Sequence, residues 1–77
     1  MSGILEILGE RIRELRLDKG LSQEELAAAA GISRDYVGDI EHGRYKMTVT
    51  VLVRVAHALG TDGWALLQHA ERKARKQ

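Results

Sequence analysis

The chain has 77 residues, a formal net charge of +1, and neither cysteine nor proline. We expect a single small domain over residues 1–77, in which no disulfide can add stability. The hydrophobic fraction is 44%, but only three residues are aromatic, which favours an all-α fold with an aliphatic core. A core of this size is only marginally stable, so a homodimer is the expected source of further stability.

Membrane and secretory proteins are excluded by the distribution of apolar residues. No apolar run approaches the ~20 residues that a membrane span needs, and the first residues lack the pattern of a signal peptide. We therefore expect a cytoplasmic protein with no membrane partner. The sequence pI of about 8.2 does not by itself indicate a nucleic-acid partner, because nucleic-acid-binding domains often exceed ~9.

The first expected helix covers residues 4–18. Its apolar residues recur at steps of 3, 4 and 3, which places them on one face of a helix. These residues are Leu5, Leu8, Ile12 and Leu15. Gly20 suits the left-handed backbone conformation that commonly ends a helix, so we expect the first helix to stop there.

Two further helices are predicted within residues 22–43. Ser22 and Glu25 are spaced as a capping box at the start of one helix, and Gly31 ends that helix. Ser33 can cap the next helix, which runs towards the end of this range. Because only about three residues join these two helices, the chain must turn sharply between them.

Residues 48–59 allow two interpretations. The stretch MTVTVLV alternates like a β-strand, yet a helical spacing of apolar residues starts at Val49 and continues through RVAHALG. A lone strand would have no partner segment, so we predict a helix capped by Thr48. A second apolar row, with Val51 and Val55, makes this helix apolar on more than one side. We expect that second side to meet another subunit.

A fifth helix is expected from about residue 62 to residue 74. Trp64 and Leu67 lie along one line of this helix, and Leu66 lies along another. We predict that the helices within residues 48–74 form the dimer interface through five apolar side chains. They are Val51, Val55, Trp64, Leu66 and Leu67.

The spacing within residues 23–40 matches a helix-turn-helix unit. Two helices that cross at a steep angle need a small residue at the crossing, here Ala27, and a positive φ in the turn, here at Gly31. Ile32 can fill the turn. The pattern is completed by apolar residues that lock the two helices together, namely Leu26, Val37 and Ile40.

These residues resemble a known family. RIRELRLDKGLSQEELAAAAGIS is similar to the first three helices of the Xre/Cro-type helix-turn-helix proteins, and LVRVAHALG is similar to the fourth. Within that family, SRDYVGDIEHG looks most like the controller proteins of restriction–modification systems. The resemblance covers about residues 9–60 and implies a five-helix, lambda-repressor-like helix-turn-helix domain.

The resemblance also implies a partner and roles for individual residues. A homodimer would bind a palindromic double-stranded DNA operator, with the start of the third helix in the major groove. The base-contacting positions of the family are matched by Ser33, Arg34, Asp35 and Tyr36. The positions that contact the DNA backbone are matched by Gln23, Arg44 and Lys46, with Tyr45 in the same basic loop.

The residue types suit most of these roles, but two carboxylates need an explanation. Arg34 can donate two hydrogen bonds to guanine O6 and N7, and Gln23 can donate to a phosphate. Asp35 and Asp39, in contrast, bring negative charge to the reading helix. Asp35 suits the first turn of a helix, where it can also hold Arg34 in place or accept a hydrogen bond from cytosine.

We therefore expect a sequence-specific regulator of transcription that acts at the nucleoid. Bound upstream of a promoter it could help to recruit RNA polymerase, and bound over a promoter it would block access. No sensor domain lies within the 77 residues, so the concentration of the protein is the expected signal. The best narrow match is a restriction–modification controller that regulates its own promoter.

Other classes of function fit the sequence less well. An enzyme is not expected, because the chain lacks a cysteine nucleophile and a glycine-rich phosphate loop. The three histidines have no metal-ligand spacing, so we expect neither a metal nor a cofactor. Two alternatives remain open: another small Xre-type regulator, such as a phage repressor or an antitoxin, and a protein-interaction module that kept the fold but lost DNA binding.

Overall fold

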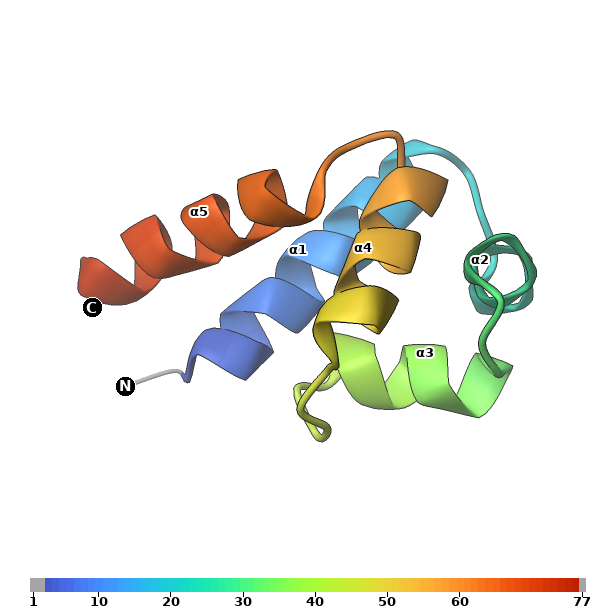
Figure 1. The fold of residues 1–77 in the computed structure, drawn as a ribbon, viewed down its shortest axis with the longest axis horizontal. Coiled ribbons are helices and arrows are strands. Elements are labelled where there is room, and N and C mark those ends of the chain that lie inside the picture. Colours follow the sequence, from blue (N-terminus) through green and yellow to red (C-terminus); the bar gives the residue numbers. More distant parts are fainter. Residues whose placement is uncertain (1–2, 77) are drawn as a thin grey trace.

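The computed structural model describes residues 3–76, which form five α-helices and no strand. The helices span about 33 × 23 × 22 Å, and Figure 1 shows their arrangement. Their bounds are α1 Ile4–Asp18, α2 Gln23–Ala30, α3 Arg34–Glu41, α4 Val49–Ala58 and α5 Gly63–Arg75. The prediction of an all-α, five-helix domain is confirmed.

Side-chain caps set the starts of α2, α3 and α4. The Ser22 hydroxyl accepts from the Glu25 backbone N–H at 3.0 Å, while the Glu25 carboxylate accepts from the Ser22 N–H at 2.9 Å. Ser33 and Thr48 each accept from the backbone N–H three residues later, at 3.1 Å. These bonds satisfy N–H groups that have no partner within the helix. The helical interpretation of residues 48–59 is confirmed, and the strand interpretation is wrong.

The turn between α2 and α3 depends on one left-handed glycine. Gly31 has φ 72°, a value that a residue with a side chain rarely adopts. The backbone N–H of Ile32 donates to the Ala27 carbonyl at 3.0 Å, which closes the end of α2. The chain therefore turns sharply within three residues, and α3 packs against α2.

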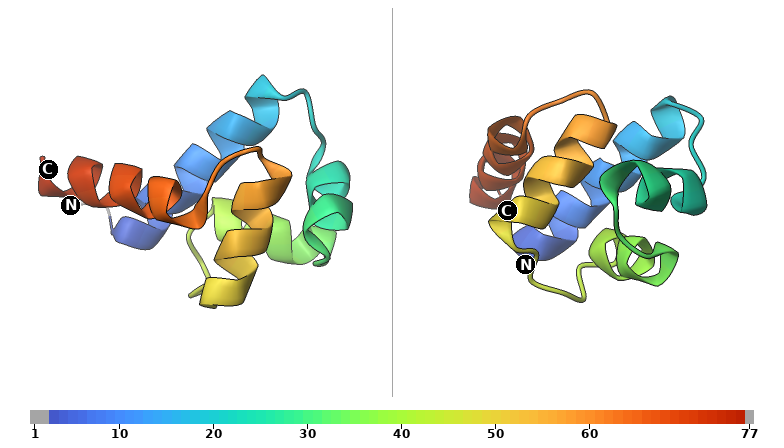
Figure 2. Two further views of the ribbon diagram at one scale, coloured as in Figure 1. Left: turned by 45° about the horizontal axis from the view of Figure 1, so that its top comes forward. Right: turned by 45° about the vertical axis from the view of Figure 1, so that its right-hand side comes forward.

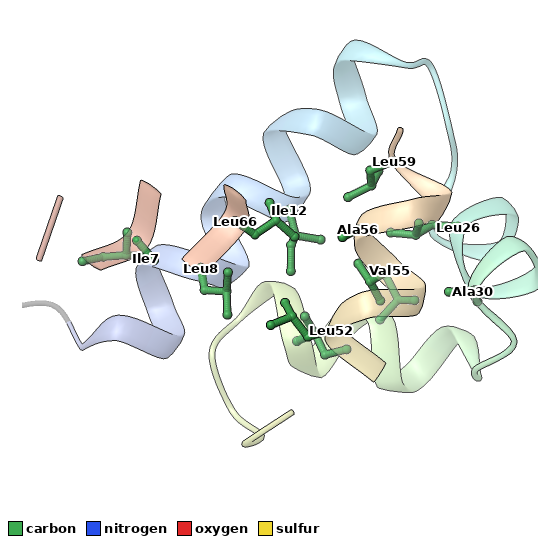
Figure 3. Packing of buried hydrophobic residues seen from close by; sticks show 14 residues of the cluster. Ile7, Leu8, Ile12, Leu26, Ala30, Leu52, Val55, Ala56, Leu59 and Leu66 are labelled. Carbon is green, nitrogen blue, oxygen red and sulfur yellow. The ribbon is translucent and has the colours of Figure 1, made fainter. Parts of the chain in front are cut away.

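The core lies between the helices and is aliphatic. α1 packs against α3 and α5, while α4 packs against α2 and α5. Figure 3 shows side chains from α1, α2, α4 and α5 pointing into this common interior. The buried apolar residues are Ile7, Leu8, Ile12, Leu26, Ala27, Ala30, Val37, Ile40, Leu52, Val55, Ala56, Leu59, Leu66 and Ala70. The α2 and α3 residues predicted to lock the two helices together are all among them.

Two residues that we predicted in a dimer interface lie in this core instead. Val55 is 1% exposed and Leu66 is 2% exposed within the single chain, so neither side chain is free to contact a second subunit. The outward apolar row of α4 consists of Val49 and Val53 rather than the row through Val51 and Val55. The sequence pattern identified a helix with two apolar sides but did not indicate which side faces outward.

Gly9 allows α1 and α3 to approach closely. A Cβ atom at this position would lie 2.8 Å from the Glu41 carbonyl oxygen and closer still to that of Ile40. Since backbone atoms cannot move aside easily, Gly9→Ala should lower the free energy of unfolding by about 1–3 kcal/mol. Gly38→Ala is the matched control, because a Cβ there meets nothing within 4 Å.

Gly38→Ala should instead stabilise α3 by about 0.5–1 kcal/mol, since glycine is a poor residue for a helix interior. Urea unfolding of the two variants beside the unsubstituted chain measures both effects. Equal effects of the two substitutions would show that no close approach occurs at Gly9.

Candidate nucleic-acid interface

α2 and α3 form one end of the molecule, away from the C-terminal part of α5 (Figure 1). Both views in Figure 2 show the same separation. At the start of α3, Ser33, Arg34 and Asp35 are exposed, while Tyr36 is half-buried. The structure thus brings the four predicted base-contact residues together on the first turn of a helix that borders the solvent.

A shallow hollow of about 380 Å³ lies beside these residues. Side chains from α2, α3 and the following loop line it together, which brings two predicted base contacts, Arg34 and Asp35, beside two predicted backbone contacts, Gln23 and Arg44. The lining residues are Gln23, Arg34, Asp35, Gly38, Asp39, His42 and Arg44. The His42 ring Nδ1 lies 2.8 Å from the Gly38 carbonyl oxygen, so this nitrogen carries the proton that it donates to the carbonyl.

Two arginines of this face form ion pairs within the chain. The Arg34 Nε atom lies 3.6 Å from Glu24 Oε1, which joins α3 to α2. The Arg44 Nη1 atom lies 3.5 Å from Asp39 Oδ1. Of the two roles open to Asp35, holding Arg34 is not observed, because the carboxylate paired with Arg34 is that of Glu24 on α2.

The loop after α3 is attached to the start of α3 by an aromatic contact. The rings of Tyr36 and Tyr45 meet edge to face, with centroids 6.2 Å apart and planes 79° apart. Such a geometry is favourable for aromatic rings. It brings Tyr45, which is largely exposed, beside a predicted base-contact residue. Arg44 and Lys46 flank this tyrosine, so the contact also positions the two cations of the loop.

A buried ion pair between Arg16 and Glu41 joins α1 to α3. The Arg16 Nε atom donates to Glu41 Oε2 at 2.6 Å, and its Nη2 atom donates to Glu41 Oε1 at 3.1 Å. Arg16 Nη1 also donates to the Leu21 carbonyl at 2.8 Å. The hydrogen bond to Glu41 raises the pKa of Arg16 above its ordinary value, and burial acts in the opposite direction. Two parallel bonds of this kind fix both the distance and the orientation of α1 and α3.

Gln23 joins the same network. Its side-chain Nε2 donates to Glu41 Oε1 at 3.1 Å, which ties the start of α2 to the end of α3. An amide nitrogen carries two protons, so the second N–H remains available to an external acceptor. The backbone N–H groups at the start of α2 also favour an anion. The structure therefore allows the predicted phosphate contact of Gln23 without breaking its internal bond.

Arg16 and Glu41 are not among the residues predicted from the sequence to form the site. A sequence signal for both residues does exist. Arg16 follows Ile12 by one helical turn on the buried side of α1, and Glu41 follows Val37 in the same way on α3. A single charge on an apolar line of a helix indicates a buried partner, because an unpaired buried charge is strongly unfavourable.

A second surface is apolar and lies on α4 and α5. Val49 is 77% exposed and Trp64 is 65% exposed, and Val53 and Leu67 are also exposed. A Cβ placed at Gly63 would lie 3.4 Å from Val53 Cγ2, so the start of α5 adjoins the outward row of α4. We call Val49, Val53, Trp64 and Leu67 the α4–α5 patch. Of the predicted interface residues, only Trp64 and Leu67 belong to this patch, and Val51 is half-buried beside it.

Two further observations apply to residues 3–76. No helix there combines the length and the apolar character needed to cross a membrane. Within the same residues, no group of three or more histidine, cysteine, aspartate or glutamate side chains is placed to hold a metal ion.

A comparison with protein-family sequence models matches residues 7–69 of this chain to the helix-turn-helix domain family. The chain belongs to the helix-turn-helix family. This match confirms the resemblance to Xre/Cro-type proteins that the sequence indicated.

Individual relatives agree with this assignment. The control protein C.SmaI of Serratia marcescens is 41% identical over 59 residues, which cover 77% of this chain and 70% of that protein. The immunity repressor of Bacillus phage phi105 is 43% identical over 60 residues, which cover 78% of this chain and 42% of the repressor. Among solved structures, the restriction–modification controller protein C.AhdI of Aeromonas hydrophila is 42% identical. The two structures match with a TM-score of 0.78 over 80% of this chain and 94% of C.AhdI.

Proposed function

We propose that this protein is a transcription regulator that binds double-stranded DNA in a sequence-specific manner. The observation that carries the proposal is the exposed first turn of α3, with Arg34 at its surface and a basic loop beside it. In this arrangement α3 enters the major groove with its first turn at the base edges. The helix-turn-helix family to which the chain belongs supports the same geometry.

The proposed contacts divide into two groups. Ser33, Arg34, Asp35 and Tyr36 contact base edges, and Arg34 has the chemistry to read a guanine through O6 and N7. Gln23, Arg44, Tyr45 and Lys46 contact the sugar–phosphate backbone. Backbone contacts supply affinity and orientation, while the base contacts supply sequence discrimination.

We further propose that the protein acts as a homodimer on an inverted repeat in the cytoplasm. The α4–α5 patch supports a dimer, because large exposed apolar side chains on adjoining helices commonly mark a site of association. The two-fold symmetry of a dimer would match that of an inverted repeat, with one copy of α3 for each half-site. Half-sites would then be centred about one helical turn, or ~34 Å, apart.

Trp64→Glu tests the proposed dimer. A charge placed in the centre of an apolar interface should weaken dimerisation at least about tenfold, since each ~1.4 kcal/mol changes the dissociation constant by that factor. Sedimentation equilibrium measures the monomer fraction directly. Leu17→Glu is the control, because Leu17 is similarly exposed but lies on α1. If both variants remain as dimeric as the unsubstituted chain, the interface lies elsewhere.

The narrower proposal is a restriction–modification controller that regulates its own promoter and that can help to recruit RNA polymerase. The likeness to C.SmaI and C.AhdI supports it. A phage repressor is a second candidate, since the phi105 immunity repressor has a similar identity. Genes for a methyltransferase and an endonuclease beside this gene would favour the controller, and genes for an integrase would favour the repressor.

Selection from random duplexes tests the proposed function. The purified protein is incubated with a duplex library at moderate salt, and the bound fraction is amplified and sequenced. The expected result is an enriched inverted repeat with half-sites about one helical turn apart. If no sequence is enriched, the protein does not bind DNA in a sequence-specific manner. That result would favour the protein-interaction module, and the carboxylates on α3 would then be part of its protein-binding surface.

A further inference from the structure

We propose that Glu24 is a specificity-determining residue that acts by positioning Arg34. This inference rests on the proposed DNA-binding function. Glu24 does not contact a base in this account. It holds the Arg34 guanidinium for a guanine edge and opposes the transfer of that guanidinium to a phosphate.

The geometry of the ion pair carries the proposal. Glu24 Oε1 faces the Nε atom of Arg34 at 3.6 Å. In the planar guanidinium, a carboxylate beside Nε lies on the side-on edge and does not occupy the end-on edge that the two terminal nitrogens form. These are the atoms that donate in an end-on bidentate contact with guanine O6 and N7. A carboxylate on the Nε side thus orients the arginine and leaves its base-reading end free.

The exposure of the pair argues against a role in folding. The side chains of Arg34 and Glu24 are 60% and 71% exposed. Exposed pairs of this kind contribute little to stability, because water and salt screen them. Docking of DNA on this face would exclude water, however, so the same two charges would interact more strongly in a complex.

The charges on the face formed by α2 and α3 indicate that Glu24 opposes the binding of phosphates. Three carboxylates, those of Glu24, Asp35 and Asp39, lie around two guanidinium groups, those of Arg34 and Arg44. A phosphate that binds the guanidinium of Arg34 or Arg44 must therefore displace a carboxylate of the chain from it. A guanidinium paired within the chain releases fewer DNA counterions than a free one, so non-specific affinity is lowered.

The consequence differs between an operator and other DNA. On random DNA, Arg34 could gain affinity only by leaving Glu24 for a phosphate. On the operator, Arg34 reaches its guanine while the pair with Glu24 is kept. Glu24 thus reduces non-specific binding more than operator binding, and the ratio of the two affinities rises.

Glu24→Gln tests this role, with Glu71→Gln as the matched control. Glu71 also pairs with an arginine, Arg75, at 3.6 Å, but it lies on α5. Both substitutions remove one negative charge from an exposed ion pair. Fluorescence anisotropy measures binding to the selected duplex and to a shuffled duplex over a range of salt concentrations. Thermal unfolding of each variant accompanies the binding measurements and shows whether the fold is retained.

In Glu24→Gln, affinity for the shuffled duplex should rise about fivefold, which corresponds to one charge pair at water-like screening. Its salt dependence should become steeper by about one unit, because one more phosphate is neutralised. Operator affinity should change less, so that discrimination falls. Glu71→Gln should leave the affinity ratio as it is. Combining Glu24→Gln with Arg34→Ala should abolish the effect, because Glu24 acts through Arg34.

Two results would overturn the proposal while the proposed function stands. One is an unchanged affinity ratio in Glu24→Gln when the unsubstituted chain does discriminate. The other is an equal loss of discrimination with and without Arg34, which would mean that Glu24 repels phosphates directly. Failure of the unsubstituted chain to discriminate would instead remove the proposed function together with this inference.

Discussion

Glu41→Ala is expected to lower the free energy of unfolding by about 3–5 kcal/mol, the cost of leaving a buried charge without its partner. The side chain of Arg16 is 9% exposed and that of Glu41 is 1% exposed, so water cannot replace the lost carboxylate. A domain of this length has a total stability of roughly 4–12 kcal/mol. The substitution should therefore remove much of the stability of the fold.

Urea unfolding followed by circular dichroism measures this loss without adding salt. Glu14→Ala is the control, because Glu14 pairs with Arg11 at 3.4 Å on the exposed side of the same helix as Arg16. Glu14→Ala should lower the free energy of unfolding by no more than about 0.5 kcal/mol. Equal effects of the two substitutions would contradict a structural role for the buried pair.

If Glu41→Ala does not fold, a double substitution still tests the role of the buried pair. Replacing Arg16 by Met and Glu41 by Leu together removes both charges and leaves apolar side chains of similar volume. Such replacements are often neutral or stabilising. We expect Arg16→Met/Glu41→Leu to recover most of the stability that Glu41→Ala loses. Gln23 loses its partner in both variants, so this loss does not contribute to the difference between them.

Arg34→Ala is expected to have the largest effect on operator binding. A bidentate contact with guanine is worth about 1–3 kcal/mol, and a dimer would make two of them, so the loss should reach about 2–6 kcal/mol. Discrimination at one base pair of each half-site should relax at the same time. Competition binding with operators substituted at each position identifies that base pair.

Arg75→Ala is the control for the loss of a cation. Arg75 pairs with Glu71 as Arg34 pairs with Glu24, but on α5. Its removal should leave operator discrimination as it is. Uniform weakening of Arg34→Ala on every sequence, with discrimination retained, would show that Arg34 contacts a phosphate rather than a base.

The sequence predicted the helices well because local chemistry determines their ends. Ser22, Ser33 and Thr48 cap the helices that were expected to start after them. Gly20 and Gly31 adopt the positive φ that their positions indicated. Each of these interactions joins residues within a few positions of one another, so the pattern can be recognised without knowledge of the fold.

The parts that the sequence did not predict depend on contacts between distant residues. Arg16 and Glu41 lie 25 positions apart and meet only because Gly9 lets α1 approach α3. Likewise, the apolar pattern of α4 could not indicate that Val55 faces inward and Val49 faces outward. That distinction is set by the packing of α2 and α5 around α4.

The partner of Arg34 shows the same limit at the candidate site. Asp35 is its neighbour in the chain, but adjacent residues on a helix point about 100° apart and do not face each other. Glu24 is ten positions away and comes close because the turn at Gly31 brings α2 beside α3. The carboxylate that matters for Arg34 was therefore visible only in the folded chain.

In the proposed complex, the first turn of α3 and the loop after it bind the operator. A titration of ¹⁵N-labelled protein with the selected duplex, followed by amide chemical shifts, tests this claim residue by residue. We expect the largest changes at residues 33–39 and 44–46, with much smaller changes when a shuffled duplex replaces the operator. Changes concentrated on the C-terminal half of α5, with α3 unaffected, would contradict it.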